Sequence, residues 1–343
     1  MDSAALIRQK NCLNTIRLLA ALQVMLQHLQ EHFVLPPALE PLRLVLSLFP
    51  GVPLFFMLSG FLIWNSLDTT TSYPLFLKKR FLRIYPELWV SVAFELLCLV
   101  LLNPEPIPLP ELLLFAFGQA TVFQFWKPAS VTGYGTGTPN GALWTIPVMV
   151  LFYVLVWWIH KTLKGKKFSR WIPWLLLSIA LALAVPAGKA VLPEILYKLL
   201  RYSLIPHFWL FLAGMLTARW VRLLLPVLKK YWYLLLLAEL TLINLSLDFE
   251  LGYYGLFNSL LLFWAWLGFA YRFPGLRLSP DISYGVYIYH MLIVNLLMTL
   301  FGPSTPWLVP ASLLLSLLAG FLSTKFIGSL AKYIKQKFLT HPQ

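Results

Sequence analysis

The stretch LNTIRLLAALQVMLQHLQEHF, residues 13–33, constrains what the rest of the chain can be. At ~1.5 Å of rise per residue, it is long enough to cross the ~30 Å hydrocarbon core of a bilayer. It nevertheless contains Arg17 and His28, with Glu31 and His32 near its far end. Ionisable side chains at membrane depth are costly, so their presence indicates a functional site.

The spacing of these residues suggests a binding surface along one helix. Arg17 and His28 are eleven positions apart, so at ~100° per residue they lie within ~20° of the same stripe, roughly 16 Å apart along the axis. The stripe positions between them are the small residues Ala20, Ala21 and Val24. We expect a basic group, a narrow groove and a proton carrier, which together would suit an elongated anionic ligand.

The composition is that of a membrane protein. Of 343 residues, 59% are hydrophobic and 12% are charged, and the mean hydropathy is +0.75. A soluble domain of this size needs far more polar surface. The net charge of +14 comes from Lys and Arg in short loops, where they set orientation in the membrane. We therefore expect membrane lipids as surroundings and no nucleic acid as a partner.

We predict an all-α fold, a polytopic membrane helical bundle that forms a single domain over residues 1–343. The apolar runs predict about ten transmembrane helices, at 14–35, 47–67, 88–103, 142–160, 171–187, 204–221, 231–248, 252–271, 282–301 and 307–330. A further apolar run at 110–126 is predicted to be interfacial or re-entrant, because a crossing there would put the most basic loop, 160–170, outside. Both termini are then cytoplasmic.

Two short segments carry further signals. The first, YPLFLKKRFLRIYPELW (73–89), is interpreted as a loop after the second span. Arg80 and Arg83 would share a face if it were helical, and with Lys79 they suit phosphate binding. A basic cluster that only sets topology is the alternative. In the second, FFMLSGFLIW (55–64), the Ser59–Gly60 pair indicates close helix packing.

The order of these pieces is similar to that of the membrane acyltransferase-3 family. The resemblance runs from residue 13 to about 300, and the ordered set is more specific than any single member. It consists of Arg17-x10-His28, FFMLSGFLI, KKRFLRIYP, NGALWTIPVMVLFY (140–153) and SYGVYIYH (283–290).

The resemblance implies an enzyme that moves an acyl group, commonly acetyl from acetyl-CoA, onto hydroxyls of carbohydrates. His28 would be the catalytic histidine and Arg17 its partner in the motif. Arg80 and Arg83, with Lys79 beside them, would meet acyl-CoA at the cytoplasmic side.

The same resemblance suggests residues for the acceptor. Asn140 and Trp144 would shape the outer mouth of the site, and Tyr287 and His290 would contact the acceptor. A lone histidine in an apolar helix is more often a hydrogen-bonded core residue, which is the alternative for His290. No metal is expected, because a site needs three or four ligands and the sequence fixes none beyond the first span.

One position departs from the family pattern. The Trp-led segment usually reads WSLSVEEQFY, whereas this chain has WTIPVMVLFY, with Met149 at the acidic position. Either Glu31 takes over the role of that carboxylate, one turn from His28, or the chain is an impaired acyltransferase. A transporter or flippase of an anionic lipid or acyl carrier is a further alternative.

The resemblance therefore implies an O-acetyltransferase of a bacterial inner membrane that acts in the cell envelope. It would take the acyl group from cytosolic acetyl-CoA, as donor substrate, to an extracytoplasmic carbohydrate such as a polysaccharide or glycolipid. His28 would act as a general base or as the carrier in an acyl-histidine intermediate.

Overall fold

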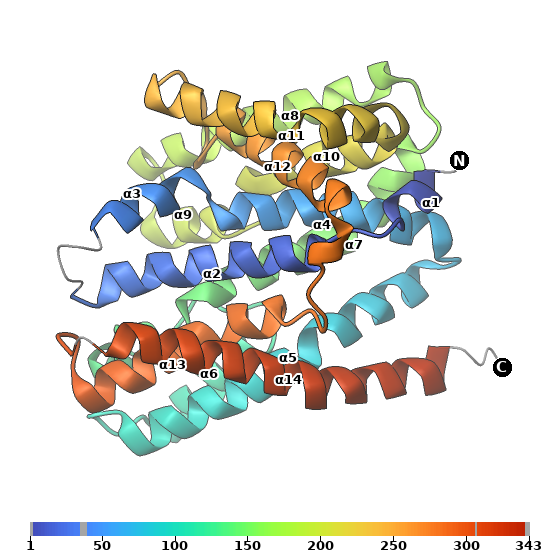
Figure 1. Ribbon diagram of the computed structural model, residues 1–343. Coiled ribbons are helices and arrows are strands. Elements are labelled where there is room, and N and C mark those ends of the chain that lie inside the picture. The colour runs from blue at the N-terminus through green and yellow to red at the C-terminus, as the bar shows by residue number, and fades with distance from the viewer. Residues whose placement is uncertain (1–2, 35–39, 306, 340–343) are drawn as a thin grey trace. The chain divides into compact units, whose positions relative to one another are not determined.

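A computed structural model of the chain describes residues 3–34, 40–305 and 307–339. The described residues are mostly helical, as the all-α prediction requires, apart from one antiparallel pair of two-residue strands (Figure 1). The elements are α1 (Ser3–Ile7), α2 (Leu13–His32), α3 (Glu40–Leu48), α4 (Gly51–Thr69), α5 (Tyr73–Leu102), α6 (Leu109–Ala120), α7 (Thr145–Leu163), α8 (Ile172–Ala187), α9 (Glu194–Arg201), α10 (Phe208–Arg219), α11 (Val221–Asn244), β1 (Glu250–Leu251), β2 (Tyr254–Gly255), α12 (Leu256–Arg272), α13 (Ser283–Phe301) and α14 (Leu308–Leu339).

Each of the ten predicted spans coincides with a helix, and seven helical segments in the described chain are long and apolar enough to cross a membrane. Among the helices at the ten predicted spans, three fall outside this set: α2 and α11, which carry more polar side chains, and α12, which has 17 residues. The polytopic helical bundle is confirmed, and the count of ten stays a prediction. Helix α6 has 12 residues, ~18 Å at ~1.5 Å each, which is too short to cross.

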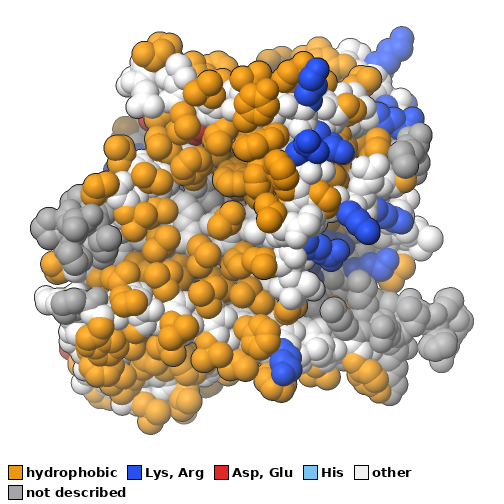
Figure 2. All heavy atoms as spheres, viewed as in Figure 1, with side chains coloured by type: hydrophobic (Ala, Val, Ile, Leu, Met, Phe, Trp, Pro, Cys, Tyr) orange, Lys and Arg blue, Asp and Glu red, His pale blue; other side chains and the backbone are white. Residues whose placement is uncertain are grey.

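Hydrophobic side chains cover most of the face seen in Figure 2, as expected where a protein meets lipid rather than water. Many large apolar residues are exposed, among them Leu101 at 69% and Leu176 at 62%. In water, a surface of this kind would associate with other apolar surfaces. The exposed side chains therefore agree with a membrane protein.

The basic segment at 73–89 corrects one prediction, because it is not a loop. Helix α5 begins at Tyr73, well before the predicted span at 88–103, and continues through Pro86. A proline inside a helix removes one hydrogen bond, but the turns on both sides continue here. Lys79, Arg80 and Arg83 are consequently helical, and the two arginines are one turn apart.

The chain divides into two compact units, each assembled from three stretches of sequence. Unit 1 comprises Met1–Ala20, Leu48–Leu77 and Val148–Leu278. Unit 2 comprises Ala21–Ser47, Lys78–Pro147 and Ser279–Gln343. The prediction of one acyltransferase domain over 1–343 stays a prediction.

Glycines set the closest helix contacts in unit 1. A Cβ on Gly60 of α4 would lie 2.2 Å from the carbonyl oxygen of Phe211, and one on Gly214 of α10 would lie 2.0 Å from that of Met57. These helices therefore pack backbone against backbone, which small residues allow in a membrane. The packing role predicted for the Ser59–Gly60 pair is confirmed at Gly60.

Unit 2 contains a small apolar core and a close glycine contact between two helices. The contact joins α13 and α14, where a Cβ on Gly285 would lie 2.7 Å from the Cα of Gly320. Leu296 of α13 packs against the core. The buried residues of the core come from α5, α6 and the segment that follows α6; they are Cys98, Leu99, Phe115, Val131 and Tyr134.

The α4–α10 contact gives a testable prediction. Replacement of Gly214 by valine should force the helices apart and destabilise the protein by about 1–3 kcal/mol, the usual cost of overpacking. We expect a lower midpoint of thermal unfolding in detergent. Gly275→Ala is the matched control, because a Cβ there meets nothing within 4 Å. Equal midpoints for the two variants would contradict this packing.

Candidate functional site

The last turn of α2 holds a histidine–carboxylate pair. His28 Nδ1 lies 3.1 Å from Glu31 Oε2, within hydrogen-bonding distance, three residues along the helix. The His28 side chain is 24% exposed and that of Glu31 is 48% exposed, so the pair is accessible. Gln27 Nε2 donates a further hydrogen bond of 3.3 Å to Glu31 Oε1. Glu31 is thus held in place on both carboxylate oxygens.

The pair fixes the chemistry of the imidazole. An ionised carboxylate only accepts hydrogen bonds, so beside an ionised Glu31 the donor is Nδ1 of His28. A neutral ring then has its lone pair on Nε2, which makes that atom available as a base or nucleophile. A hydrogen bond from the second ring nitrogen to a carboxylate is the usual way in which a catalytic histidine is oriented.

A second histidine lies against the first, within unit 2. The rings of His28 and His290 of α13 are stacked, with centroids 5.5 Å apart and planes at 24°. His290 is fully buried, and neither of its ring nitrogens has a hydrogen-bond partner among the described residues. The alternative of a hydrogen-bonded core histidine stays open, because the backbone of Val286 and Tyr287 lies one turn away within reach of the ring. Unpaired polar atoms in a buried position are costly and mark a site that a further group could complete.

Tyr287 packs against His290, and Asn140 bonds to the backbone of the same helix, but both side chains are already engaged. The Tyr287 ring meets His290 edge-on at 5.9 Å, and its hydroxyl donates to the carbonyl of Ala142 and accepts from Thr145. Asn140 Nδ2 donates to the carbonyl of Ile288 at 2.9 Å. Its Oδ1 is buried without a partner in the described chain. Contact of these residues with an acceptor stays a prediction.

His32 brings a third donor close to the pair. Its ring is stacked on His28 with centroids 6.1 Å apart. One ligand atom each from His28, Glu31 and His32 lies within 4.8 Å of the others, a grouping that could hold a metal ion. The expectation that no metal binds is not tested by this geometry and stays a prediction.

The polar segment at 135–140 is hydrogen-bonded to α13 through Asn295, five residues after His290. Asn295 Oδ1 accepts from Thr136 N at 2.7 Å, and its Nδ2 donates to the carbonyls of Thr138 and Pro139. Gly135 has a positive φ of 52°, and a Cβ there would lie 2.3 Å from Asn295 Oδ1. Asn295 was not singled out in the sequence, where only a polar residue within an apolar run could have indicated it. The turn 135–140 is thus fixed to the helix that carries His290.

The predicted groove on α2 is corrected by the structure. Arg17 and His28 do lie on one continuous helix, as predicted. The small residues between them are buried, with Ala20 at 4%, Ala21 at 0% and Val24 at 5% exposure. Small side chains invite close packing of neighbouring backbone, and the stripe is therefore filled rather than open.

The predicted cofactor-binding residues lie on two helices. On α5, Lys79 and Arg80 are partly buried and Arg83 is exposed. Arg17 on α2 is also partly buried, and both Arg17 and Arg80 already take part in interactions within the protein. Trp144 closes the short 3-10 helix Gly141–Trp144 directly before α7. Their roles with a ligand stay predictions.

Comparison with known proteins gives one family and two relatives. Residues 10–325 match the acyltransferase-3 family, described as an acyltransferase domain. The chain is 29% identical to Nodulation protein 10 of Rhizobium leguminosarum bv. viciae over 321 residues, which cover 87% of each chain. It is 28% identical to an O-acetyl transferase of Shigella phage Sf6 over 191 residues, or 54% of this chain and 56% of that protein. No solved structure matches significantly.

The link between Asn295 and the 135–140 turn can be tested. Asn295→Ala removes three hydrogen bonds from a fully buried side chain, and unsatisfied buried groups cost about 1–3 kcal/mol. We expect a lower unfolding midpoint and faster protease cleavage within 135–140. Asn244→Ala, on an exposed position that bonds only within its own helix, is the control. Unchanged cleavage would show that Asn295 does not anchor the turn.

Proposed function

This chain belongs to the acyltransferase-3 family, and on that premise we propose that it is a membrane O-acetyltransferase with His28 at its reacting centre. The donor would be cytosolic acetyl-CoA, and the acceptor a hydroxyl of an extracytoplasmic carbohydrate or glycolipid. The protein would lie in a bacterial inner membrane with both termini in the cytoplasm. The observation that carries the proposal is the hydrogen-bonded His28–Glu31 pair beside His290.

The proposed chemistry uses Nε2 of His28, the ring nitrogen that does not face Glu31. As a general base, Nε2 takes the proton from the acceptor hydroxyl while its oxygen attacks the thioester carbonyl. The carbon–sulfur bond then breaks, and the coenzyme A thiolate leaves and takes up the proton. As a nucleophile, Nε2 would first displace the thiolate to form an acyl-histidine, which the hydroxyl would then attack. Both routes need a neutral ring with a lone pair on Nε2.

The donor is proposed from charge and from the family. Coenzyme A is anionic, and Arg80 and Arg83 lie one turn apart on α5 with Lys79 beside them. Guanidinium groups bind phosphates through paired hydrogen bonds. Arg17 would provide a further cationic contact from α2. The acetyl group is proposed because one relative is named as an O-acetyl transferase.

The acceptor is proposed to lie beside His290. That ring is buried next to His28 with two nitrogens that lack partners in the described chain, so it could receive or donate a hydrogen bond to a bound hydroxyl. Tyr287 packs against it, Asn140 bonds to the backbone of the same helix, and Trp144 lies on the segment that follows Asn140. A sugar offers several hydroxyl groups to such polar and aromatic neighbours, which supports a carbohydrate or glycolipid acceptor.

Glu31 supports an active enzyme over an impaired one. Met149 occupies the position at which the family usually has an acidic residue. Glu31 Oε2 lies 3.1 Å from His28 Nδ1 on the same helix, a contact that would orient the imidazole ring. We propose that Glu31 supplies the orienting carboxylate and that Met149 does not abolish activity.

The roles of His28 and Glu31 give the main prediction. With purified protein, labelled acetyl-CoA and a carbohydrate acceptor, His28→Ala should lower transfer by about 10²–10⁴-fold, the usual share of acid–base catalysis. Glu31→Gln should lower kcat by about tenfold or more, because an amide no longer fixes the tautomer. Glu105→Gln, on an exposed residue outside the site, controls for lost negative charge. Full activity of His28→Ala would disprove the proposed function.

The arginine pair gives a separate prediction. Replacing both Arg80 and Arg83 with glutamine should raise KM for acetyl-CoA about tenfold or more and change kcat little, because two phosphate contacts are lost. Arg43→Gln, an exposed cation on α3, is the control for net charge. An unchanged KM would mean that the pair serves only to orient the chain in the membrane.

A further inference from the structure

Helix α2 ends with a histidine that the proposed chemistry does not use. His32 is the last residue of the helix and lies four residues after His28. At ~100° per residue, His28, Glu31 and His32 fall within ~100° of one another around the helix axis. The two imidazole rings are nearly parallel, at 7°, with centroids 6.1 Å apart. The last turn of α2 therefore presents two imidazoles and a carboxylate on one face.

The sequence order of these residues is also that of a zinc-binding arrangement. Residues 28–32 read HLQEH, with the histidines at i and i+4 and the glutamate between them. Paired histidines one turn apart, with a glutamate in the same turn, hold zinc on a helix in several classes of enzyme. A site needs three or four ligands. The expectation of no metal was based on a lack of ligands, and this single turn brings three together.

The distances within the cluster are close to those of a metal site. One ligand atom each from His28, Glu31 and His32 lies within 4.8 Å of the others. His28 Nδ1 and Glu31 Oε2 are 3.1 Å apart. Two ligands of a tetrahedral zinc, with bonds of about 2.1 Å, lie ~3.4 Å apart, so the remaining approach is at most ~1.4 Å. Rotation of a partly exposed histidine side chain supplies a movement of that size without any change of the backbone.

The donor atoms select a transition metal ion over Mg²⁺ or Ca²⁺. Imidazole nitrogens suit Zn²⁺, whereas Mg²⁺ and Ca²⁺ prefer sites made of oxygen ligands. Two imidazoles and one carboxylate are the protein ligands of several zinc enzymes, with water in the fourth position. Gln27 Nε2 donates to Glu31 Oε1 at 3.3 Å, an outer hydrogen bond of the kind that orients a ligating carboxylate.

The cluster is also accessible to an ion. The His28 side chain is 24% exposed and that of Glu31 is 48% exposed, and His32 is partly exposed. The negative charge of an ionised Glu31 attracts a cation to the two rings. In the proposed orientation, with the N-terminus in the cytoplasm, this end of α2 is on the extracytoplasmic side. The ion would therefore arrive from outside the cytoplasm.

We propose that His28, Glu31 and His32 bind Zn²⁺ and that the bound ion stops acyl transfer. The inhibition rests on the proposed function, because it requires Nε2 of His28 as the reacting atom. Zinc on Nε2 takes the lone pair of that atom. Zinc on Nδ1 leaves the ring proton on Nε2, which then has no lone pair either. Both modes of binding block transfer, so zinc acts here as an inhibitor and not as a cofactor.

Direct binding to the full-length protein in detergent tests the site without any need for acyl transfer. The probe is Zn²⁺, followed by isothermal titration calorimetry, and we expect one ion per chain. His32→Gln should weaken binding about tenfold or more, because one of three ligands is lost. Mg²⁺ should not compete. Elution as a single species in size-exclusion chromatography shows that each variant is folded.

A matched control separates this site from a general effect of removing a histidine. His160→Gln removes an imidazole from unit 1, where the ring lies 3.1 Å from Asp68. We expect this variant to bind Zn²⁺ as the unaltered protein does. Equal affinity in His32→Gln and His160→Gln overturns the proposed site, as does saturation only at millimolar Zn²⁺.

The inhibition is measured with labelled acetyl-CoA and a carbohydrate acceptor. Zn²⁺ should stop transfer by the unaltered protein, and excess chelator should restore it. The half-inhibiting Zn²⁺ concentration, compared with each variant's own activity without zinc, should rise about tenfold or more in His32→Gln, in step with the lost affinity. Binding of zinc without inhibition overturns the proposed block of His28. Loss of activity on chelation would make zinc a requirement and overturns it as well.

The two arms keep this inference separate from the proposed function. A protein that transfers no acetyl group in the absence of zinc, yet binds one Zn²⁺ that His32→Gln releases, refutes the proposed function and supports the metal site. A protein that transfers acetyl through His28 but binds zinc equally well as His32→Gln supports the proposed function and refutes the metal site.

Discussion

The structure depends on one constraint, the lack of water inside a bilayer to satisfy polar groups. The backbone meets it by forming helices, whose hydrogen bonds lie within each segment. Polar side chains meet it by pairing within the protein, as His28 does with Glu31 and Asn295 with the turn at 135–140. The residues that remain unpaired are then informative. His290 is buried, its ring nitrogens make no hydrogen bond of good geometry with the described residues, and its ring lies against that of His28.

Helices α2 and α13 carry the candidate reacting side chains and are also held by closely packed residues. The small residues at positions 20, 21 and 24 are buried, so α2 is held along much of its length before its last turn presents His28 and Glu31. Helix α13 is held in a similar way, by Gly285 against Gly320 on one side and by Asn295 on the turn before α7. Rigid placement of this kind is what catalysis requires of a reacting pair.

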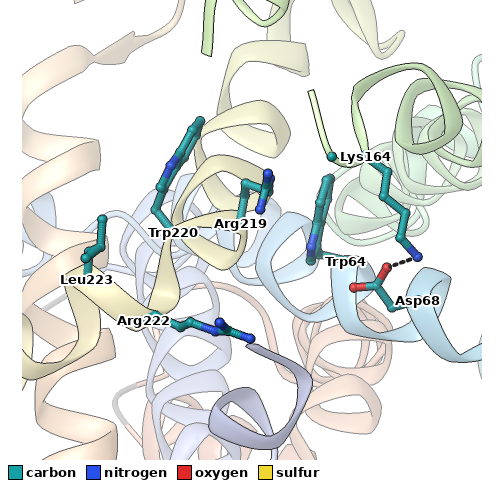
Figure 3. A pocket seen from close by; sticks show the side chains of 8 residues that line it. Trp64, Asp68, Lys164, Arg219, Trp220, Arg222 and Leu223 are labelled. Carbon is teal, nitrogen blue, oxygen red and sulfur yellow. Dashed lines mark ion pairs between the residues drawn. The ribbon is translucent and has the colours of Figure 1, made fainter. Parts of the chain in front are cut away.

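The basic residues fall into two groups that the sequence did not separate. Those on α5 lie in unit 2, in a helix that the sequence analysis took for a loop. Those at the α10–α11 junction lie in unit 1 and surround a cavity with two indoles. In the sequence both groups resemble the basic clusters that set the orientation of a protein in the membrane, because positive charge alone sets that orientation. The second group lines a cavity together with Trp64 and Trp220, a neighbourhood that the sequence does not show (Figure 3).

The sequence alone determined the membrane class, the helical fold and the family, because these follow from hydropathy, periodicity and the order of short motifs. It also placed Arg17 and His28 on one helix, since helical spacing fixes the angle between them. It could not decide whether the small residues between them form a groove or a packed contact, because that depends on what lies opposite. The His28–His290 stack, the anchoring by Asn295 and the Trp–Arg cavity likewise join residues far apart in the chain. Tertiary packing decides such contacts, and no local rule of spacing contains them.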